Sequence, residues 1–293
     1  MVDPWSVVTS VTGVEIRPVT GVFGAEILGV RLVELDESEL TNVRDLMCRH
    51  EVVVFRDQYL TPAEQSEFSR RLGPSAETPF VRTMDEHPDV IRVVKEADEG
   101  SAFNFGGAWH SDFSFLENPP SFTILGAVDV PPYGGDTVFA SMTAAWRALD
   151  GETHDRFRTL RAVHTARDAY SRRMQPIHSG MRGMVIECDD SADDERRHPL
   201  VRRHPETGAT VLFFNRAYVR DIDGMERAEA VELLNFLHAH STDAVFTYRH
   251  RWQSGDVVVW DNRSTQHLAL NDYAGFRREL TRTTVQGEVP TSA

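Results

Sequence analysis

The chain carries Trp109-His110-Ser111-Asp112 and, much later, Trp260-Asp261-Asn262-Arg263-Ser264-Thr265-Gln266-His267. In an extended strand successive side chains point to opposite faces, so His110 and Asp112, two positions apart, point the same way and can hold one metal ion. A third ligand must come from another part of the chain, and His267 at the end of the second segment is a candidate. The two segments together predict a metal site built partly on a β-strand.

The candidate ligands are two imidazoles and one carboxylate. Bound on one face of an octahedron, such a set leaves three positions open, and non-haem Fe(II) oxygenases use this ligand set. The open positions are where a co-substrate and oxygen would bind. From the residues alone His267 cannot be clearly preferred over other histidines of the chain, such as His164, His178, His238, His240 and His250.

The 293 residues carry a formal net charge of −14, with a pI near 5.3. Nucleic acids and anionic membranes require concentrated positive charge on their partner, so this balance argues against both and favours a small-molecule enzyme. Residues 1–10 have no basic start and no apolar stretch, and no segment approaches the roughly 20 apolar residues of a membrane span. Cys48 and Cys188 lack Cys-x-x-Cys spacing, which fits a reducing compartment. We therefore expect a cytoplasmic protein with neither nucleic acid nor membrane as partner.

Short β-rich runs recur along the chain and predict a barrel or jelly roll. They are residues 52–55, 121–128, 137–139, 210–214, 245–248, 257–260 and 279–285. Because all-β barrels of this length often form one unit, we expect a single domain over residues 1–293.

Three helices are expected outside the sheet. Capping-box signals at Asp36 and Thr61, the second followed by proline, each precede an amphipathic stretch. A third helix is expected at about 228–240, and its predicted buried residues are Val231, Leu234 and Leu237 or Phe236. Residues 75–101 and 168–199 show no such periodicity and are interpreted as long loops that act as lids over the metal site.

Arg278, Leu280 and Arg282 alternate along a predicted strand and share one face. If Leu280 faces the core, both guanidinium groups do too, and buried guanidinium groups are costly unless anions meet them. The alternative, in which the opposite face is buried and both arginines are solvated, stays open from the pattern alone. Gly134-Gly135-Asp136-Thr137 adds a tight turn into a strand, where the Thr137 hydroxyl can donate to a carboxylate, although such a turn is also typical of any hairpin.

With these motifs in this order and spacing, the chain resembles the TauD/TfdA family of Fe(II)- and 2-oxoglutarate-dependent dioxygenases from about Val14 to Gly287. The matching motifs are residues 109–112, 134–137, 260–267 and 277–282. The resemblance implies a mainly β fold, a cupin-like double-stranded β-helix (jelly roll) with flanking helices. It also implies an oxidoreductase that binds Fe(II) and uses 2-oxoglutarate and O2 as co-substrates. Such an enzyme hydroxylates a small anionic organic substrate, in some cases thereby cleaving it, and releases succinate and CO2.

The resemblance also implies roles for single residues. His110, Asp112 and His267 would ligate iron and form the catalytic centre, and Thr137 with Arg278 would bind the distal carboxylate of 2-oxoglutarate. Family members form dimers or tetramers, so a homo-oligomer is expected.

For the primary substrate, Arg282 matches the family's arginine for an anionic group: a carboxylate, a sulfonate or a sulfate ester. The rest of the pocket departs from the taurine enzymes, because Thr78 stands where they carry a histidine and Tyr218 replaces a phenylalanine. Phe113 and Tyr218, together with Phe80, Phe103 and Phe105, are further candidates for an apolar pocket. These departures argue against taurine and leave aryloxy acids, sulfate esters, larger carboxylates and modified amino acids open.

Two other functions are compatible with parts of this pattern. A catalytically silent sensor of 2-oxoglutarate or metal would have no need of complete ligand and arginine sets. A zinc-dependent jelly-roll hydrolase or isomerase could use two histidines and one aspartate, but it has no evident use for a buried Arg278 beside Thr137. Oxygen-dependent formation of succinate separates the dioxygenase from both.

Overall fold

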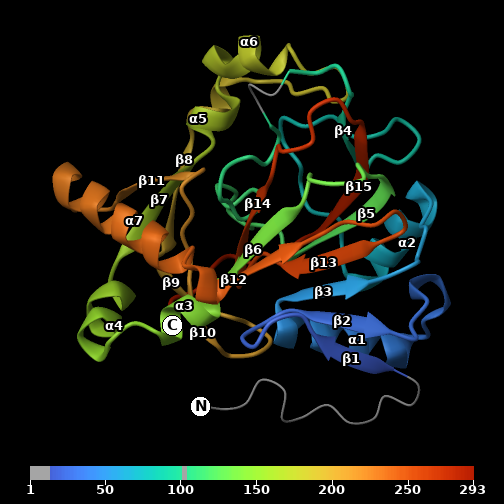
Figure 1. The fold of residues 1–293 in the computed structure, drawn as a ribbon. Helices are drawn as coiled ribbons and strands as arrows, with labels where there is room; N and C mark the ends of the chain where they lie inside the picture. Colours follow the sequence, from blue (N-terminus) through green and yellow to red (C-terminus); the bar gives the residue numbers. More distant parts are fainter. Residues whose placement is uncertain (1–13, 101–103) are drawn as a thin grey trace.

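The computed structural model describes residues 14–100 and 104–293 (Figure 1). Its largest element is a seven-stranded sheet whose neighbouring strands are antiparallel except for the β2–β3 pair. In spatial order the strands are β1 (Glu15–Pro18), β2 (Ala25–Leu28), β3 (Val52–Phe55), β13 (Val257–Asp261), β5 (Phe122–Asp129), β15 (Arg278–Val285) and β4 (Ile91–Lys95).

A smaller sheet packs against one face of this large sheet. It consists of β12 (Thr247–His250), β6 (Thr137–Ser141) and β14 (Thr265–Ala269). Between the two sheets Phe139 meets Trp260 at a ring-centroid distance of 5.4 Å, and Val54, Val258 and Leu280 complete the same apolar cluster. Two facing, mainly antiparallel sheets around one core form a jelly roll, so the predicted fold is confirmed.

The opposite face of the large sheet is covered by two helices, α1 (Glu37–His50) and α2 (Pro62–Leu72). Each begins with a complete capping box. The side chain of Asp36 or Thr61 accepts the backbone N–H of the glutamate three residues on, and the side chain of that glutamate accepts the backbone N–H of the capping residue. The apolar stripe of α1 packs onto Val53 and Val257. With both faces covered, β3 and β13 read as continuous apolar runs rather than as alternating ones.

A third layer lies beside the jelly roll and contains two small sheets. They are β11 (Val219–Ile222), β7 (Arg161–Thr165) and β8 (Glu195–Pro199) in one, and β9 (Val201–Arg203) and β10 (Thr210–Leu212) in the other. Three helices accompany them: α3 (Met142–Arg147), α4 (Gly151–Arg158) and α7 (Arg227–Ser241). One apolar cluster joins α3, α4 and α7 to these strands.

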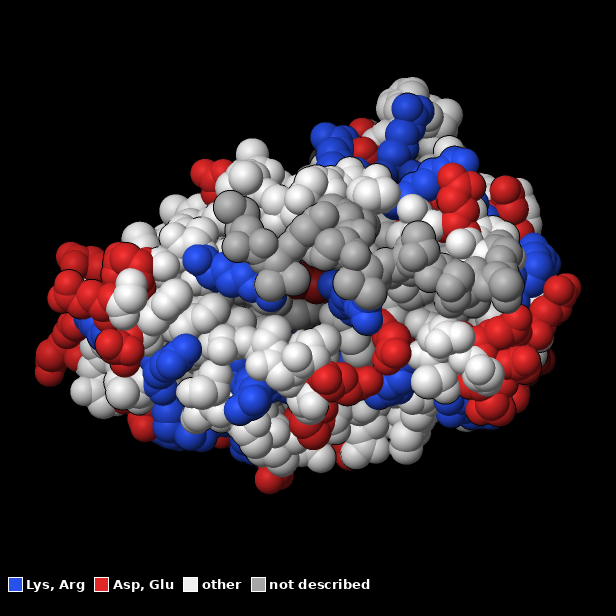
Figure 2. All heavy atoms as spheres, turned by 90° about the horizontal axis from the view of Figure 1, so that it is seen from below, with Lys and Arg blue, Asp and Glu red and all other residues white. Residues whose placement is uncertain are grey.

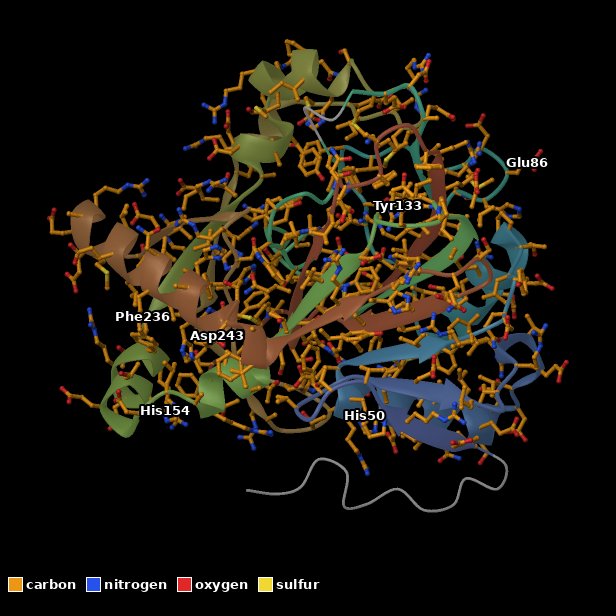
Figure 3. The ribbon with its side chains drawn as sticks, viewed as in Figure 1. His50, Glu86, Tyr133, His154, Phe236 and Asp243 are labelled. Atoms are coloured by element: carbon orange, nitrogen blue, oxygen red, sulfur yellow. The ribbon has the colours of Figure 1, made fainter. Side chains whose placement is uncertain are left out.

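Helix α7 lies where a helix was predicted, but the prediction of its buried face was partly wrong. Leu234 and Leu237 are buried as expected, whereas Val231 and Phe236 are 36% and 49% exposed (Figure 3 labels Phe236). Leu233 takes part in the buried face instead.

The two segments interpreted as loops contain more regular structure than predicted. Residues 75–100 include β4, an edge strand of the large sheet, and Ser101 lies outside the described residues. Residues 168–199 include most of α5 (Arg167–Tyr170), α6 (Gln175–His178) and β8, with the 3₁₀ turns η2 (Arg172–Met174) and η3 (Asp190–Asp193). The strand expected at 245–248 begins later, because η4 (Ala244–Phe246) precedes β12, and a further 3₁₀ turn is η1 (Leu32–Glu34).

Charge is distributed unevenly over the surface. On the face shown in Figure 2, acidic side chains gather toward both ends and basic side chains are interspersed between them. Among the described residues, no helix combines the length and the apolar character needed to cross a membrane.

Candidate metal and co-substrate site

The structure brings the three predicted metal ligands together. His110 and His267 form a β-bridge in which each backbone N–H donates to the other residue's carbonyl, at 3.0 and 2.7 Å. This bridge sets the two imidazoles side by side, with ring centroids 4.1 Å apart. Ligand atoms of His110, Asp112 and His267 all lie within 4.8 Å of one another, and all three side chains are buried.

The protonation states of these groups suit a divalent cation. His110 Nδ1 lies 2.7 Å from the carbonyl of Ala108, which can only accept, so Nδ1 carries a proton and Nε2 is the ring nitrogen that can face a metal. Burial and the neighbouring His110 hold the pKa of His267 well below its usual value, so this imidazole is neutral. Burial alone would raise the pKa of Asp112, but the charge of the adjoining Arg282 guanidinium brings it below its usual range, so the carboxylate is ionised. Two imidazole nitrogens and one carboxylate are a donor set that fits Fe(II).

Beside the ligands, a small cavity of about 40 Å³ is lined by Thr137, Arg278 and His267, among others. Arg278 is only 6% exposed, and its Nε and Nη2 have no hydrogen-bond partner in the described part of the chain. Burial lowers the pKa of Arg278, which Tyr273 and Asp136 partly restore. A buried guanidinium with free donors fits a carboxylate such as the distal one of 2-oxoglutarate.

Thr137 is held by a residue that the sequence did not single out. The indole Nε1 of Trp252 donates to Thr137 Oγ1 at 3.0 Å, so the threonine's own hydroxyl hydrogen is free to donate elsewhere. The Trp252 ring lies 5.8 Å from the guanidinium carbon of Arg278. Trp252 therefore contacts both residues that were expected to bind the co-substrate.

Arg282 lies between the metal ligands and a larger cavity. Its Nη1 lies 3.2 Å from Asp112 Oδ1, while Nε and Nη2 have no partner among the described residues. The guanidinium sits against the rings of Phe105 and Phe113, at 5.6 and 5.1 Å from their centroids. The prediction that Leu280 and both arginines of the strand turn inward is met by their burial.

The larger cavity, of about 630 Å³, opens from the metal ligands and includes Phe105, Phe113 and Tyr218 in its lining. Phe113 adopts a positive φ of 46°, which is uncommon for an aromatic residue and turns the chain sharply after Asp112. Tyr170 also lines this cavity and was missed, because it falls in a segment that has no periodic pattern. Burial raises the pKa of both tyrosines, so their phenols stay neutral.

Two other candidates from the sequence are not in the lining. Thr78 is half-buried and is not among the residues that line either cavity. Phe80 stacks on Tyr170 at 5.0 Å, behind the cavity wall. Phe103 lies outside the described residues.

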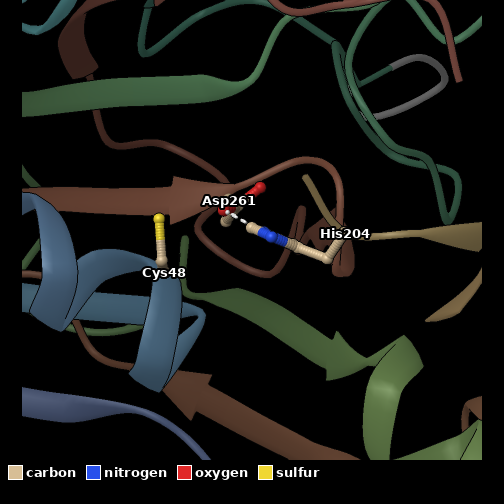
Figure 4. Close-up of side chains that lie close together, drawn as sticks. All are labelled: Cys48, His204 and Asp261. Atoms are coloured by element: carbon tan, nitrogen blue, oxygen red, sulfur yellow. Dashed lines mark hydrogen bonds and ion pairs between the residues drawn. The ribbon is translucent and has the colours of Figure 1, made fainter. Parts of the chain in front are cut away.

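A second cluster of potential ligands consists of Cys48, His204 and Asp261 (Figure 4). Arg263 donates to both oxygens of Asp261, at 2.8 and 2.6 Å, and His204 Nε2 donates to Oδ2 at 2.9 Å. His204 Nδ1 accepts two backbone N–H groups, so it has no lone pair to offer a metal. Burial raises the pKa of the Cys48 thiol. This cluster is therefore a hydrogen-bonded ion network that braces the turn between β13 and β14.

The fold and the donor set of the first cluster are those of a class of enzymes, the non-haem Fe(II) oxygenases. Comparison with known proteins agrees with this class. The model of the family described as "Taurine catabolism dioxygenase TauD, TfdA family" matches residues 15–284.

Two relatives and one solved structure illustrate the similarity. The chain is 34% identical over 278 residues to an alpha-ketoglutarate-dependent sulfate ester dioxygenase of Pseudomonas putida, and the aligned region covers 94% of this chain and 90% of that protein. It is 33% identical over 285 residues to an alpha-ketoglutarate-dependent 2,4-dichlorophenoxyacetate dioxygenase of Cupriavidus pinatubonensis, with 92% of this chain and 96% of that protein covered. The crystal structure of a taurine dioxygenase from Burkholderia xenovorans has a TM-score of 0.79 and 33% identity, covering 96% of this chain and 93% of that chain.

The chain belongs to the TauD/TfdA family. It is an Fe(II)- and 2-oxoglutarate-dependent dioxygenase, an oxidoreductase that uses Fe(II), 2-oxoglutarate and O2. The predictions of family, fold, reaction class and cofactors are thus confirmed, whereas the roles of individual residues stay predictions.

Proposed function

We propose that this enzyme hydroxylates an organic substrate that joins an apolar body to one anionic group. The observation that carries this proposal is the position of Arg282. Its guanidinium has two donor nitrogens without a partner among the described residues, contacts Asp112, and lines a cavity of about 630 Å³ together with Phe105 and Phe113. An anion paired with Arg282 would hold the adjoining carbon beside the metal ligands, and such positioning selects the C–H bond that reacts.

In this proposal the cofactor is held by His110, Asp112 and His267. Bound there with 2-oxoglutarate and O2, Fe(II) supplies the oxidising chemistry, and the co-products are succinate and CO2. Arg278 pairs with the distal carboxylate of the co-substrate, and the Thr137 hydroxyl donates a second bond to it. These contacts orient the 2-oxo acid end toward the metal ligands. They also give the buried guanidinium the hydrogen-bond acceptors that solvent would otherwise provide.

The size and lining of the larger cavity support a substrate bigger than taurine. Tyr170, Tyr218 and Phe113 offer an apolar wall, and a volume of this order is typical of pockets for drug-sized ligands. The relatives named above act on sulfate esters and on 2,4-dichlorophenoxyacetate, which are both anions with an apolar body. We infer that a sulfate ester or an aryloxy carboxylate is the substrate. When the oxidised carbon carries the ester or ether oxygen, hydroxylation is followed by cleavage.

Only the first part of the 168–199 segment supplies residues that line the larger cavity. Tyr170, Met174 and His178 all come from the start of the 168–199 segment and line the cavity. We propose that residues 168–178 cover the bound substrate, within a single domain that assembles as a homo-oligomer. Movement of residues 168–178 away from the cavity would admit substrate and release product.

The experiment measures succinate release and O2 consumption with a panel of alkyl sulfates, phenoxyacetates and taurine. Arg282→Met is compared with a matched control, Arg277→Met, because Arg277 lies next in sequence to Arg278 and pairs outside the site with Glu96 and Glu279. We expect substrate-dependent turnover with the apolar anions, and Arg282→Met to lower kcat/KM by about 100-fold, the value of one charge-assisted pair. Turnover of neutral analogues at the same rate as of anions, or an equal loss in both variants, would contradict the proposal.

A further inference from the structure

Seven residues of the motif 260–267 precede the predicted ligand His267, and one of them, Asn262, contacts the segment that carries His110 and Asp112. Asn262 is 2% exposed, and its Oδ1 accepts from the indole Nε1 of Trp260 at 3.0 Å and from the backbone N–H of Asp112 at 3.2 Å. Both partners can only donate, so the orientation of the Asn262 amide is fixed. Its Nδ2 therefore faces Thr123 Oγ1, to which it donates at 2.8 Å.

This bond also fixes the hydroxyl of Thr123. Thr123 lies on β5 directly opposite Trp260 of β13 and is completely buried. Its oxygen already accepts from Asn262, so its hydrogen is free to donate, and Asp112 Oδ2 lies 2.7 Å away. The donor and the acceptor of each hydrogen bond in this series are therefore fixed: Asn262 donates to Thr123, and Thr123 donates to Asp112.

The two oxygens of Asp112 are thereby made different. Oδ2 receives the Thr123 hydroxyl, whereas Oδ1 faces His110 Nε2 at 3.5 Å and Arg282 Nη1 at 3.2 Å. We propose that Asn262 and Thr123 are positioning residues that present Asp112 to the metal through Oδ1 alone. A carboxylate held in this way occupies one coordination position, so three positions stay open for the co-substrate and O2.

This inference rests on the proposed metal site, and it assigns a role to Asn262 that ligand spacing does not reveal. The competing explanation is that Thr123 and Asn262 only satisfy each other in the core. Both explanations predict some loss of stability when the pair is broken. The two explanations differ in what they predict for metal affinity. Breaking the pair weakens metal binding if Thr123 and Asn262 position Asp112, and leaves it unchanged if they only satisfy each other in the core.

The test measures Mn(II) binding by electron paramagnetic resonance and the Co(II) absorption spectrum, which reports coordination number, on the full-length protein. Thr123→Val removes the hydroxyl at constant shape, Thr123→Ala removes it without placing a methyl against Asp112, and Thr123→Ser keeps it. Thr283→Val is the matched control, because Thr283 lies on the neighbouring strand β15, is equally buried, and its hydroxyl has no partner among the described residues.

We expect Thr123→Val and Thr123→Ala to weaken Mn(II) binding by about 10- to 100-fold and to alter the Co(II) spectrum. Thr123→Ser and Thr283→Val should stay within about threefold of the wild type, since each keeps the hydroxyl bond to Asp112. Unchanged Mn(II) affinity in both hydroxyl-free variants, or an equal loss in Thr283→Val, would overturn the assignment. Absence of Mn(II) binding in the wild type would overturn the metal site itself, and with it the proposed function.

Discussion

The buried Arg278 should make the protein less stable without its co-substrate than it would be with a neutral residue in that position. Arg278 is 6% exposed, and two of its donor nitrogens have no partner in the described part of the chain. Each unsatisfied buried donor costs about 1–3 kcal/mol. Arg278→Met keeps the aliphatic stem and removes the charge, while contacts with Tyr273 and Trp252 offset part of the gain. We expect the metal-free variant to be more stable than the wild type by about 1–3 kcal/mol.

The ligand should cancel or reverse this difference in stability. With Mn(II) present and 2-oxoglutarate at 100 times its Kd, the wild type gains about 2.7 kcal/mol, and the variant, which lacks the carboxylate partner, should gain almost nothing. Urea unfolding of both proteins with and without co-substrate measures the four values. A variant that is less stable without ligand, or that still gains stability from 2-oxoglutarate, would refute the reasoning that Arg278 is held for an anion.

Two further predictions concern other residues. Trp252→Phe removes the N–H that fixes Thr137, so the affinity for 2-oxoglutarate, measured by calorimetry with Mn(II), should fall by about fivefold, the value of one net hydrogen bond, while Mn(II) affinity is unchanged. Equal losses of both affinities would point to a general structural defect instead. Burial lowers the pKa of His198 from 6.5 to about 4, so the unfolded chain binds a proton more readily, and this contribution to stability is full above pH 6.5 and lost as pH falls toward 4. His198→Gln, which can still donate to the carbonyl of Leu116, should flatten the fall in unfolding free energy between pH 6.5 and 4.5, and an unchanged slope would contradict this assignment.

Local signals in the sequence were enough to predict two of the helices and many strands. The starts of α1 and α2 depend on side-chain to backbone bonds within four residues, so Asp36 and Thr61 revealed them directly. Helix α7 carries apolar residues on both faces, and only its packing against the third layer decides that Leu233 is buried and Phe236 exposed. Strand β4 escaped notice because it is a short edge strand with charged residues, stabilised by pairing with β15 alone.

The site divides in the same way. Alternation along β15 correctly placed Arg278 and Arg282 on one face of a strand. His110 and Asp112 do lie together, but the strand expected for them was wrong, because His110 forms an isolated β-bridge and Asp112 begins a turn. Nothing local joins His267 to His110, and only the family resemblance selected it from the other histidines. Thr123 and Trp252 could not be found from the sequence, because their roles follow from which strands pair and in which register.

The measurement that tests the central claim most directly is an anaerobic titration of the metal-free enzyme with Fe(II) and 2-oxoglutarate. A weak visible metal-to-ligand charge-transfer band should develop in the wild type, since the 2-oxo acid chelates iron only when both sites are formed. His110→Ala should lose the band because it binds iron poorly, and Arg278→Ala should require far more 2-oxoglutarate to develop it. No band in the iron-loaded wild type, or a band in both variants as strong as in the wild type, would contradict the account.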